Sequence, residues 1–447
     1  MEVKRILGKL GGLSIFLAYN TNVDVISHVD RKFEELFSEK DAKKARKRDI
    51  ELLEDRIDLL GAVFNCMKKG EGNEIQIKND ELKNWIERKL SGGEKRLGGQ
   101  AGIMSNLLSK LGCETVLYTT NLSREQAELF DKNENLTFPY LDNGELNFSH
   151  PSELWQDIDT KKNWILEFFK DQELFGVRAN TNSRFIASSP YTKENLEMGQ
   201  LERKVDELAK NMDCMILAGY HNLLEKYPDG TTWREHLDSA KEFLRRAKKA
   251  NPDLKIQIEF SAIHRRNLRK TILKEVVPLA DVLSFDTNEL DLILKDIKIG
   301  GRTPEPDEPY RMSETLREIT KELDIDAVSI HTHHYYMSVS RDYIDPRPIK
   351  KGFKFARNAA WTVASGRELR PENLELAEEV KPSERGREHR RSLADSLGDE
   401  KFSSSGIHRN EFDIVLVPNK IYDDPELTVG LGDVISSTSF AVENALG

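Results

Sequence analysis

The sequence predicts an α/β protein with a large, mostly parallel sheet covered by helices and a second, smaller domain. Three observations lead to this prediction. Seven short apolar segments have the length and composition of buried strands. Turn residues or helical patterns separate them, and strands that are apolar on both faces are typical of a parallel sheet between helical layers. The chain has 447 residues, which is too long for one ordinary hydrophobic core.

The expected strands extend over the whole chain. They are residues 13–19, 115–120, 214–220, 255–260, 281–285, 327–332 and 412–418. Helical patterns lie between them. Residues 101–112 end at Gly112, a natural helix stop, and residues 233–250 have one apolar stripe and basic residues in the last turns.

Two regions depart from this alternation. Residues 25–95 are highly charged and largely helical in pattern, and residues 135–189 mix aromatic and polar side chains. We expect both to form a small α+β lid domain. The large Rossmann-like domain would then comprise residues 1–24, 96–134 and 190–447.

Composition excludes several classes of partner. The net charge of −10 argues against a generally nucleic-acid-binding surface, and no apolar run approaches the length of a membrane span. The three cysteines, Cys66, Cys113 and Cys214, lie far apart and follow no metal-binding spacing. We therefore expect a cytoplasmic protein with small-molecule partners and neither nucleic acid nor membrane.

The stretch "TVGLGD" near the C-terminus is the first candidate site. Glycines at 430 and 432 let a ligand approach the backbone. If the following residues form a helix, its first N–H groups would bind an anion. Asp433 would then suit a general base that takes a proton from an attacking hydroxyl. The same pattern also fits a simple N-cap by Asp433.

Two further polar turns could face a ligand. In "LGGQAG" the glycines at 98, 99 and 102 flank Gln100, and the spacing is neither a Walker A loop nor a dinucleotide fingerprint. In "AYNTNVD" the side chains of Asn20, Asn22 and Asp24 follow the first strand and could share the hydroxyls of a sugar. Ordinary helix packing and an Asx turn are the structural alternatives.

Acidic and basic candidates follow other strands. Glu259 ends one strand, and Asn288, Glu289 and Asp291 follow the next. These side chains suit a Mg²⁺ ion held mostly through water. The alternative is that this segment only caps and begins a helix. Arg178 and Arg184 could bind phosphate. Three histidines, His331, His333 and His334, lack acidic partners in the sequence, and we expect them to be structural.

The order of these motifs is distinctive. "NTNVD", "GGQAGIMSN", "NSRFIAS", "IEF", "NELD" and "VGLGDVIS" occur in succession over nearly the whole chain. In this order they resemble the ADP-dependent sugar kinases, the archaeal-type glucokinases and 6-phosphofructokinases of the ribokinase-like superfamily. The resemblance implies a ribokinase-like fold with a lid, ADP as phosphoryl donor, and Mg²⁺.

The resemblance also implies a role for individual residues. Asp433 would be the catalytic base, with Gly430 and Gly432 forming the anion hole. Arg184 would contact nucleotide phosphates. The nucleotide site would further include Asn182, Val429 and Leu431. Sugar contacts would come from Asn22, Asp24, Gly99 and Gln100.

The metal network departs from the family pattern at two positions. Gln257-Ile258-Glu259 stands for the family's H-x-E, and Asn288-Glu289-Leu290-Asp291 stands for its N-E-x-E. The resemblance assigns Glu259, Asn288, Glu289 and Asp291 to magnesium and phosphate. The two substitutions leave the direct metal contacts open.

The residues that could bind the sugar point to two different acceptors. Glu74 matches a lid glutamate that favours glucose, whereas Asn163 replaces a glucokinase histidine. Cations for a sugar phosphate could come from Lys161, Lys162, Lys170 and Arg178. We expect transfer of the β-phosphoryl group of ADP to fructose 6-phosphate and also to glucose. A dedicated glucokinase, an ATP-using kinase and a non-catalytic binding protein are the alternatives, and the oligomeric state stays open, a monomer included.

Overall fold

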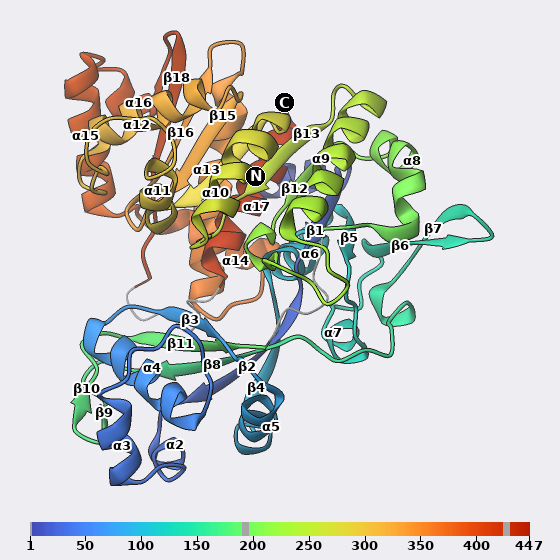
Figure 1. Ribbon diagram of the computed structural model, residues 1–447. Coiled ribbons are helices and arrows are strands. Elements are labelled where there is room, and N and C mark those ends of the chain that lie inside the picture. The colour runs from blue at the N-terminus through green and yellow to red at the C-terminus, as the bar shows by residue number, and fades with distance from the viewer. Residues whose placement is uncertain (1, 190–195, 423–429) are drawn as a thin grey trace.

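A computed structural model describes residues 2–189, 196–422 and 430–447, which fold into two lobes (Figure 1). The large lobe contains an 11-stranded sheet with the order β17-β18-β16-β15-β14-β13-β12-β1-β5-β6-β7. The small lobe contains a five-stranded sheet with the order β3-β11-β8-β2-β4. Each lobe has its own hydrophobic core. The predicted fold class, with a large sheet covered by helices and a smaller second unit, is confirmed.

The large sheet is parallel from β12 to β15 and across β1 and β5, whereas β16, β17 and β18 pair antiparallel at one edge. Its strands are β1 (Ser14–Tyr19), β5 (Glu114–Thr119), β6 (Leu136–Asp142), β7 (Glu145–Ser149), β12 (Cys214–Leu217), β13 (Lys255–Glu259), β14 (Val282–Asp286), β15 (Ala327–His331), β16 (Tyr335–Arg341), β17 (Ile407–His408) and β18 (Phe412–Pro418). All seven strands expected from the sequence lie in this sheet.

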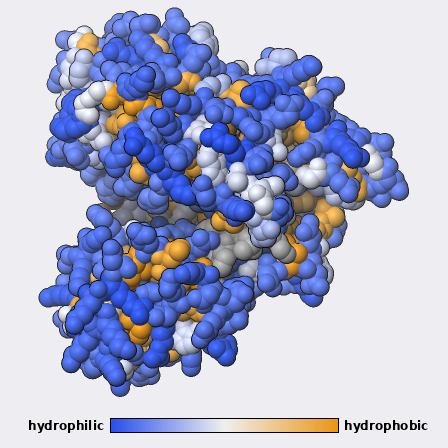
Figure 2. Space-filling model, viewed as in Figure 1, coloured by the Kyte–Doolittle hydropathy of each residue, from blue (hydrophilic) through white to orange (hydrophobic). Residues whose placement is uncertain are grey.

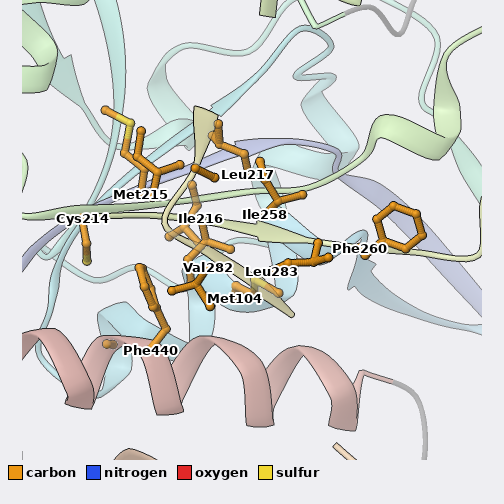
Figure 3. Close-up of a cluster of buried hydrophobic side chains, with 14 of the residues drawn as sticks. Met104, Cys214, Met215, Ile216, Leu217, Ile258, Phe260, Val282, Leu283 and Phe440 are labelled. Atoms are coloured by element: carbon orange, nitrogen blue, oxygen red, sulfur yellow. The ribbon is translucent and has the colours of Figure 1, made fainter. Parts of the chain in front are cut away.

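Helices cover this sheet because its strands are apolar on both faces. They are α1 (Glu2–Leu10), α6 (Gln100–Lys110), α7 (Arg124–Glu128), α8 (Val205–Lys210), α9 (Trp233–Ala250), α10 (Arg266–Thr271), α11 (Thr287–Leu294), α12 (Pro309–Glu322), α13 (Pro346–Ala364), α14 (Pro371–Glu379), α15 (Glu384–Leu397), α16 (Phe402–Ser405) and α17 (Leu431–Leu446). Helix α17 packs against α1, α6 and α13. Figure 3 shows its Phe440 beneath apolar side chains of β12 and β14, including Ile216 and Val282.

The small lobe is built from two parts of the chain. Its strands are β2 (Asn22–His28), β3 (Asn73–Gln76), β4 (Glu94–Gly98), β8 (Lys162–Phe168) and β11 (Ser183–Ser188), with a separate β9 (Glu173–Leu174) and β10 (Val177–Arg178) hairpin. Its helices are α2 (Arg31–Glu34), α3 (Glu39–Ala45), α4 (Arg56–Lys69) and α5 (Asp80–Lys89). Capping boxes at Ser38 and Asp55 fix the starts of α3 and α4.

The boundaries between the lobes differ from those expected. Residues 135–149 were expected in the small domain, but β6 pairs parallel with β5 and β7 pairs with β6, so this segment extends the large sheet. The chain enters the small sheet at Asn22 and leaves it at Gly98. The polar hairpin of residues 136–149 lies at a sheet edge with one solvated face, so it lacks the continuous apolar run of a central strand.

Two other expectations from the sequence concern the cysteines and membrane-spanning helices. The three cysteines are buried free thiols. Among the described helices, none is both long and apolar enough to cross a membrane.

Candidate active site

The candidate site lies in the groove between the two lobes. The parallel strands β12, β13, β14 and β15 end at the same edge of the large sheet, where ligands bind in α/β folds. Figure 2 shows the groove as a hollow between the lobes on this face of the molecule. Asp433 of the large lobe and Asp24 of the small lobe interact electrostatically across it.

The turn before α17 places Asp433 inside the first helical turn. Gly430 is the N-cap, with a φ of +78° that favours glycine, and no side chain among the described residues caps the helix start. The alternative that Asp433 itself is the N-cap is therefore wrong. The backbone N–H groups of the first turn, including that of Leu431, are left for an anion. Val429 lies outside the described residues.

Close packing explains the second glycine of this turn. A Cβ atom at Gly432 would lie 3.1 Å from Nε2 of His331, the last residue of β15. His331 was expected to be structural, and its half-buried imidazole lies against the turn before α17 and next to Asp286 in the register of β14 and β15. Any larger residue at 432 would push against this ring.

The carboxyl group of Asp433 has a raised pKa. Burial is the main cause and the charge of Asp24 is the second, and together they raise the pKa of Asp433 to about 7. A group with a pKa near neutral pH can accept a proton at neutral pH and release it afterwards. The electrostatics of Asp433 therefore suit a general base.

Three more carboxyl groups surround this position. Glu259 at the end of β13 accepts hydrogen bonds from Ser436 of α17 and, at 3.3 Å, from Nε2 of Gln257. Glu289 accepts a 2.8 Å bond from the backbone N–H of Asp286. Burial raises the pKa of both glutamates well above the usual value, and the charges of Asp286 and Asp433 raise it further.

The expected metal residues are only partly brought together. Asn288 lies beside Asp286, to which its backbone N–H donates at 2.8 Å. Asp291 instead pairs with Lys295 at 2.5 Å, and that bond is the main cause of its lowered pKa. Asp286 rather than Asp291 therefore completes the acidic cluster of Glu259, Asp286, Glu289 and Asp433. Asp286 is also the N-cap of α11, so the alternative of helix capping is confirmed at this position.

The small-lobe wall is built around Asp24. Nδ2 of Asn22 donates a 2.5 Å hydrogen bond to Oδ1 of Asp24. Burial raises the pKa of Asp24 to about 7, and the charge of Glu74 contributes in the same direction. Lys161 and Arg184 act in the opposite direction, so both cations lie near this carboxylate.

Two amide oxygens in this wall have no partner. Asn163 lies opposite Asp24 in the register of β8 and β2. Oδ1 of Asn163 and Oε1 of Gln100 are buried, and neither has a hydrogen-bond partner within the described part of the chain. Gly99 holds Gln100 close to β1, since a Cβ atom at 99 would lie 2.7 Å from the carbonyl oxygen of Asn20. Buried acceptors without donors suit a hydroxyl-bearing ligand.

Several expected residues lie away from the groove or have structural partners. Arg178 is exposed on the β9–β10 hairpin at the outer end of the small lobe and pairs with Asp171 at 2.8 Å (Figure 1). Oδ1 of Asn182 accepts a 2.7 Å bond from the backbone N–H of Lys170 and so closes a local turn. Lys162 pairs with Glu87 and Glu125 at 2.6 and 3.0 Å. Lys161 alone of the expected sugar-phosphate cations is buried at the site.

Sequence reasoning missed a group of large-lobe residues that faces Lys161 and Glu74. Nδ1 of His221 lies 2.6 Å from Oγ of Ser261. Burial lowers the pKa of His221 to about 4, and the charges of Glu74, Lys161 and Arg265 also act on it. His221 follows β12 and Arg265 follows β13, so their positions after buried strands could have identified them.

Comparison with known proteins identifies the family. The family described as the ADP-specific phosphofructokinase/glucokinase conserved region matches residues 13–442. The chain belongs to this family. The resemblance inferred from the order of the motifs is thereby confirmed.

Relatives match over almost their full length. The chain is 30% identical to the ADP-specific phosphofructokinase of Thermococcus zilligii, covering 98% of this chain and 97% of that protein. It is 28% identical to an ADP-dependent glucose/glucosamine kinase of Pyrococcus abyssi, covering 99% and 97%. A solved ADP-dependent kinase complex with fructose-6-phosphate and ADPbetaS superimposes with a TM-score of 0.88 at 29% identity, covering 100% of this chain and 96% of that one.

Proposed function

We propose that this protein transfers the β-phosphoryl group of ADP to fructose 6-phosphate, giving fructose 1,6-bisphosphate and AMP, and that it also accepts glucose. One observation carries the proposal: Asp433, with a pKa raised to about 7, lies in the first turn of a helix whose start is capped by no side chain in the described ranges. A base beside an anion site is the minimum that phosphoryl transfer to a hydroxyl requires. Membership in the ADP-specific family supports ADP as the donor.

The transfer step assigns separate tasks to the residues of the site. The sugar hydroxyl oxygen attacks the β-phosphorus, the bond to the bridging oxygen breaks, and AMP leaves. Asp433 takes the hydroxyl proton. The N–H groups at the start of α17 stabilise charge on the transferred group, and Arg184 holds the phosphates of the nucleotide. Closure of the small lobe would exclude water, which otherwise competes with the sugar as acceptor.

The acidic cluster fits a magnesium ion held mainly through water. Burial raises the pKa of Glu259 and Glu289, and the charges of Asp286 and Asp433 raise it further. A bound cation would lower these pKa values, because it favours the charged carboxylates. No group of three acidic, histidine or cysteine side chains among the described residues is arranged to hold a metal directly. When bound, the ion would neutralise charge on the phosphates.

The small-lobe wall would recognise the sugar. Asn22, Asp24, Gln100 and Asn163 offer acceptors and donors for its hydroxyl groups. Lys161 of the small lobe and Arg265 of the large lobe, whose charges both act on His221, would bind the phosphate of fructose 6-phosphate. Glu74 is near the same position, which supports glucose as a second acceptor. The buried free thiols fit a reducing, cytoplasmic location.

Initial rates decide between this function and its alternatives. The purified protein with Mg²⁺ is assayed with ADP or ATP as donor and with fructose 6-phosphate or glucose as acceptor. We expect turnover with ADP and fructose 6-phosphate, and slower turnover with ADP and glucose. Turnover with ATP alone would identify an ATP-using kinase, and turnover with glucose alone would identify a dedicated glucokinase. Ligand binding with no transfer to either sugar would indicate a non-catalytic protein.

A further inference from the structure

The edge of the large sheet beyond β18 has a local charge opposite to that of the whole chain. The net charge of the protein is −10, yet one set of cations gathers where α13 and α15 flank this edge. We call it the α13–α15 cluster, and it consists of Lys350, Lys354, Arg357, Arg387 and Arg390. None of these residues belongs to the groove described above.

The α13–α15 cluster has little compensating negative charge beyond Glu378, which acts on Arg357, and Glu384, which pairs with Arg387. Nη1 of Arg357 donates to the carbonyl oxygen of Pro418 at 2.9 Å. Arg387 pairs with Glu384. Across residues 2–189, 196–422 and 430–447, no carboxylate pairs with Lys350, Lys354 or Arg390, and their side chains donate no hydrogen bond. Charged groups that are partly buried normally have such partners.

Three guanidinium groups of the cluster also leave a donor unsatisfied. The Nε atoms of Arg357, Arg387 and Arg390 are buried without a hydrogen-bond partner in the described structure. Arg390 is held against the sheet edge, since its Cδ would lie 3.7 Å from a Cβ atom at Gly406. Buried donors without acceptors are rare in folded proteins, and three in one place indicate an acceptor that the protein itself does not supply.

The cations also repel one another. Burial is the main reason that the pKa of Arg357 falls to about 10; the charge of Arg390 lowers it further, while Tyr336 and Glu378 act in the opposite direction. Burial lowers the pKa of Lys350 too, with further contributions from Lys354, Arg390 and Arg357. The charges of the two helices are therefore close enough to interact across the sheet edge. A bound anion would replace this repulsion by attraction.

We propose that the α13–α15 cluster is a second anion site, which binds a compact polyvalent anion of the phosphate class. Guanidinium groups present paired donors that match phosphate oxygens. The cations converge from two helices on a half-buried edge, which favours a small anion over the extended backbone of a nucleic acid. The chain's own negative charge elsewhere disfavours a nucleic acid as well.

The test measures thermal stability with inorganic pyrophosphate as the probe. The full chain is melted in metal-free buffer at constant ionic strength, with pyrophosphate or with chloride. A ligand that binds the folded state raises the melting temperature saturably, and we expect a rise of about 2 °C or more at concentrations far above the Kd. Arg390→Gln and Arg357→Gln should each reduce that rise, and the part that remains comes from pyrophosphate in the nucleotide groove. Without pyrophosphate, Arg390→Gln should melt at or above the parent temperature, because it removes a repulsive charge.

Two matched variants separate this site from other effects. Arg391→Gln alters the neighbouring exposed arginine of α15, which pairs with Glu384, and should keep the full rise. Arg184→Gln weakens pyrophosphate binding in the groove and should lose only the groove's share of the rise, whereas Arg184→Gln combined with Arg390→Gln should lose the whole rise. Equal rises in the parent and in Arg390→Gln would overturn the proposal, as would a rise lost only in Arg184→Gln. If Arg390→Gln does not fold, Lys350→Gln breaks no hydrogen bond and gives the same comparison.

Discussion

The two walls of the groove are built from different chemistry. The large-lobe wall presents four carboxyl groups, Glu259, Asp286, Glu289 and Asp433, around the start of α17. The small-lobe wall presents amides and cations around a single carboxylate, Asp24. The difference supports our proposal that the large lobe provides the groups for phosphoryl transfer and the small lobe binds and orients the substrates. Substitutions in the two walls should therefore have different kinetic effects.

The largest effect should follow the loss of the base. Asp433→Asn keeps the size of the side chain but cannot accept the hydroxyl proton, and we expect kcat to fall by about 10³-fold or more. KM for both substrates should change little, because the residue acts on the reacting hydroxyl. Steady-state rates and a circular dichroism melt measure this. Asp291→Asn is the matched control and should keep kcat near the parent value, since Asp291 pairs with Lys295 away from the cluster.

The next largest effect should come from the nucleotide cation of the small lobe. Arg184→Gln removes a half-buried guanidinium near Asp24, and we expect kcat/KM for ADP to fall by about 10²-fold. Initial rates over a range of ADP concentrations measure it. Arg178→Gln tests the same type of change on the outer hairpin, where Arg178 pairs only with Asp171, and should be near neutral. Equal losses in the two variants would contradict the placement of the site.

The sequence predicted the large lobe better than the small one, for a physical reason. Central parallel strands such as β12 and β13 are buried on both faces and read as continuous apolar runs. The strands β2 and β4 of the small sheet have partly exposed residues, and their mixed pattern predicted no strand. The hairpin at 136–149 was assigned to the wrong lobe for the same reason.

The candidate site was predicted where a motif follows a buried strand or opens a helix. Asp433, Asp24 and Glu259 all lie in such positions and meet at the groove. Position along the chain does not reveal which way a side chain points, so Asp291 and Arg178 were placed in the site although each has a partner elsewhere. Asp286, His221 and His331 were missed because their contacts are made between distant segments.

A smaller effect should separate the two sugars. Glu74 acts electrostatically on both Asp24 and His221, so it lies near the sugar side of the groove. We expect Glu74→Ala to lower kcat/KM for glucose about tenfold relative to that for fructose 6-phosphate, because a lost hydrogen bond to a hydroxyl costs about one order of magnitude. Competition between the two sugars in one assay measures the ratio. An unchanged ratio would remove Glu74 from the acceptor site.

The smallest effect concerns coupling between the walls. Because the pKa of Asp433 is raised to about 7, the base is protonated below that pH, and kcat/KM should rise with pH to a plateau above it. The charge of Asp24 contributes to this raised value. Asp24→Asn removes that charge, so the pKa of Asp433 falls and the midpoint of the rise moves to lower pH. The pH profile of kcat/KM measures the midpoint independently of any loss in absolute rate.

The matched variant Asn22→Asp retains the carboxylate at 24 and should leave the midpoint at or above the parent value. A midpoint that stays fixed in Asp24→Asn would mean that the two walls act on the proton separately.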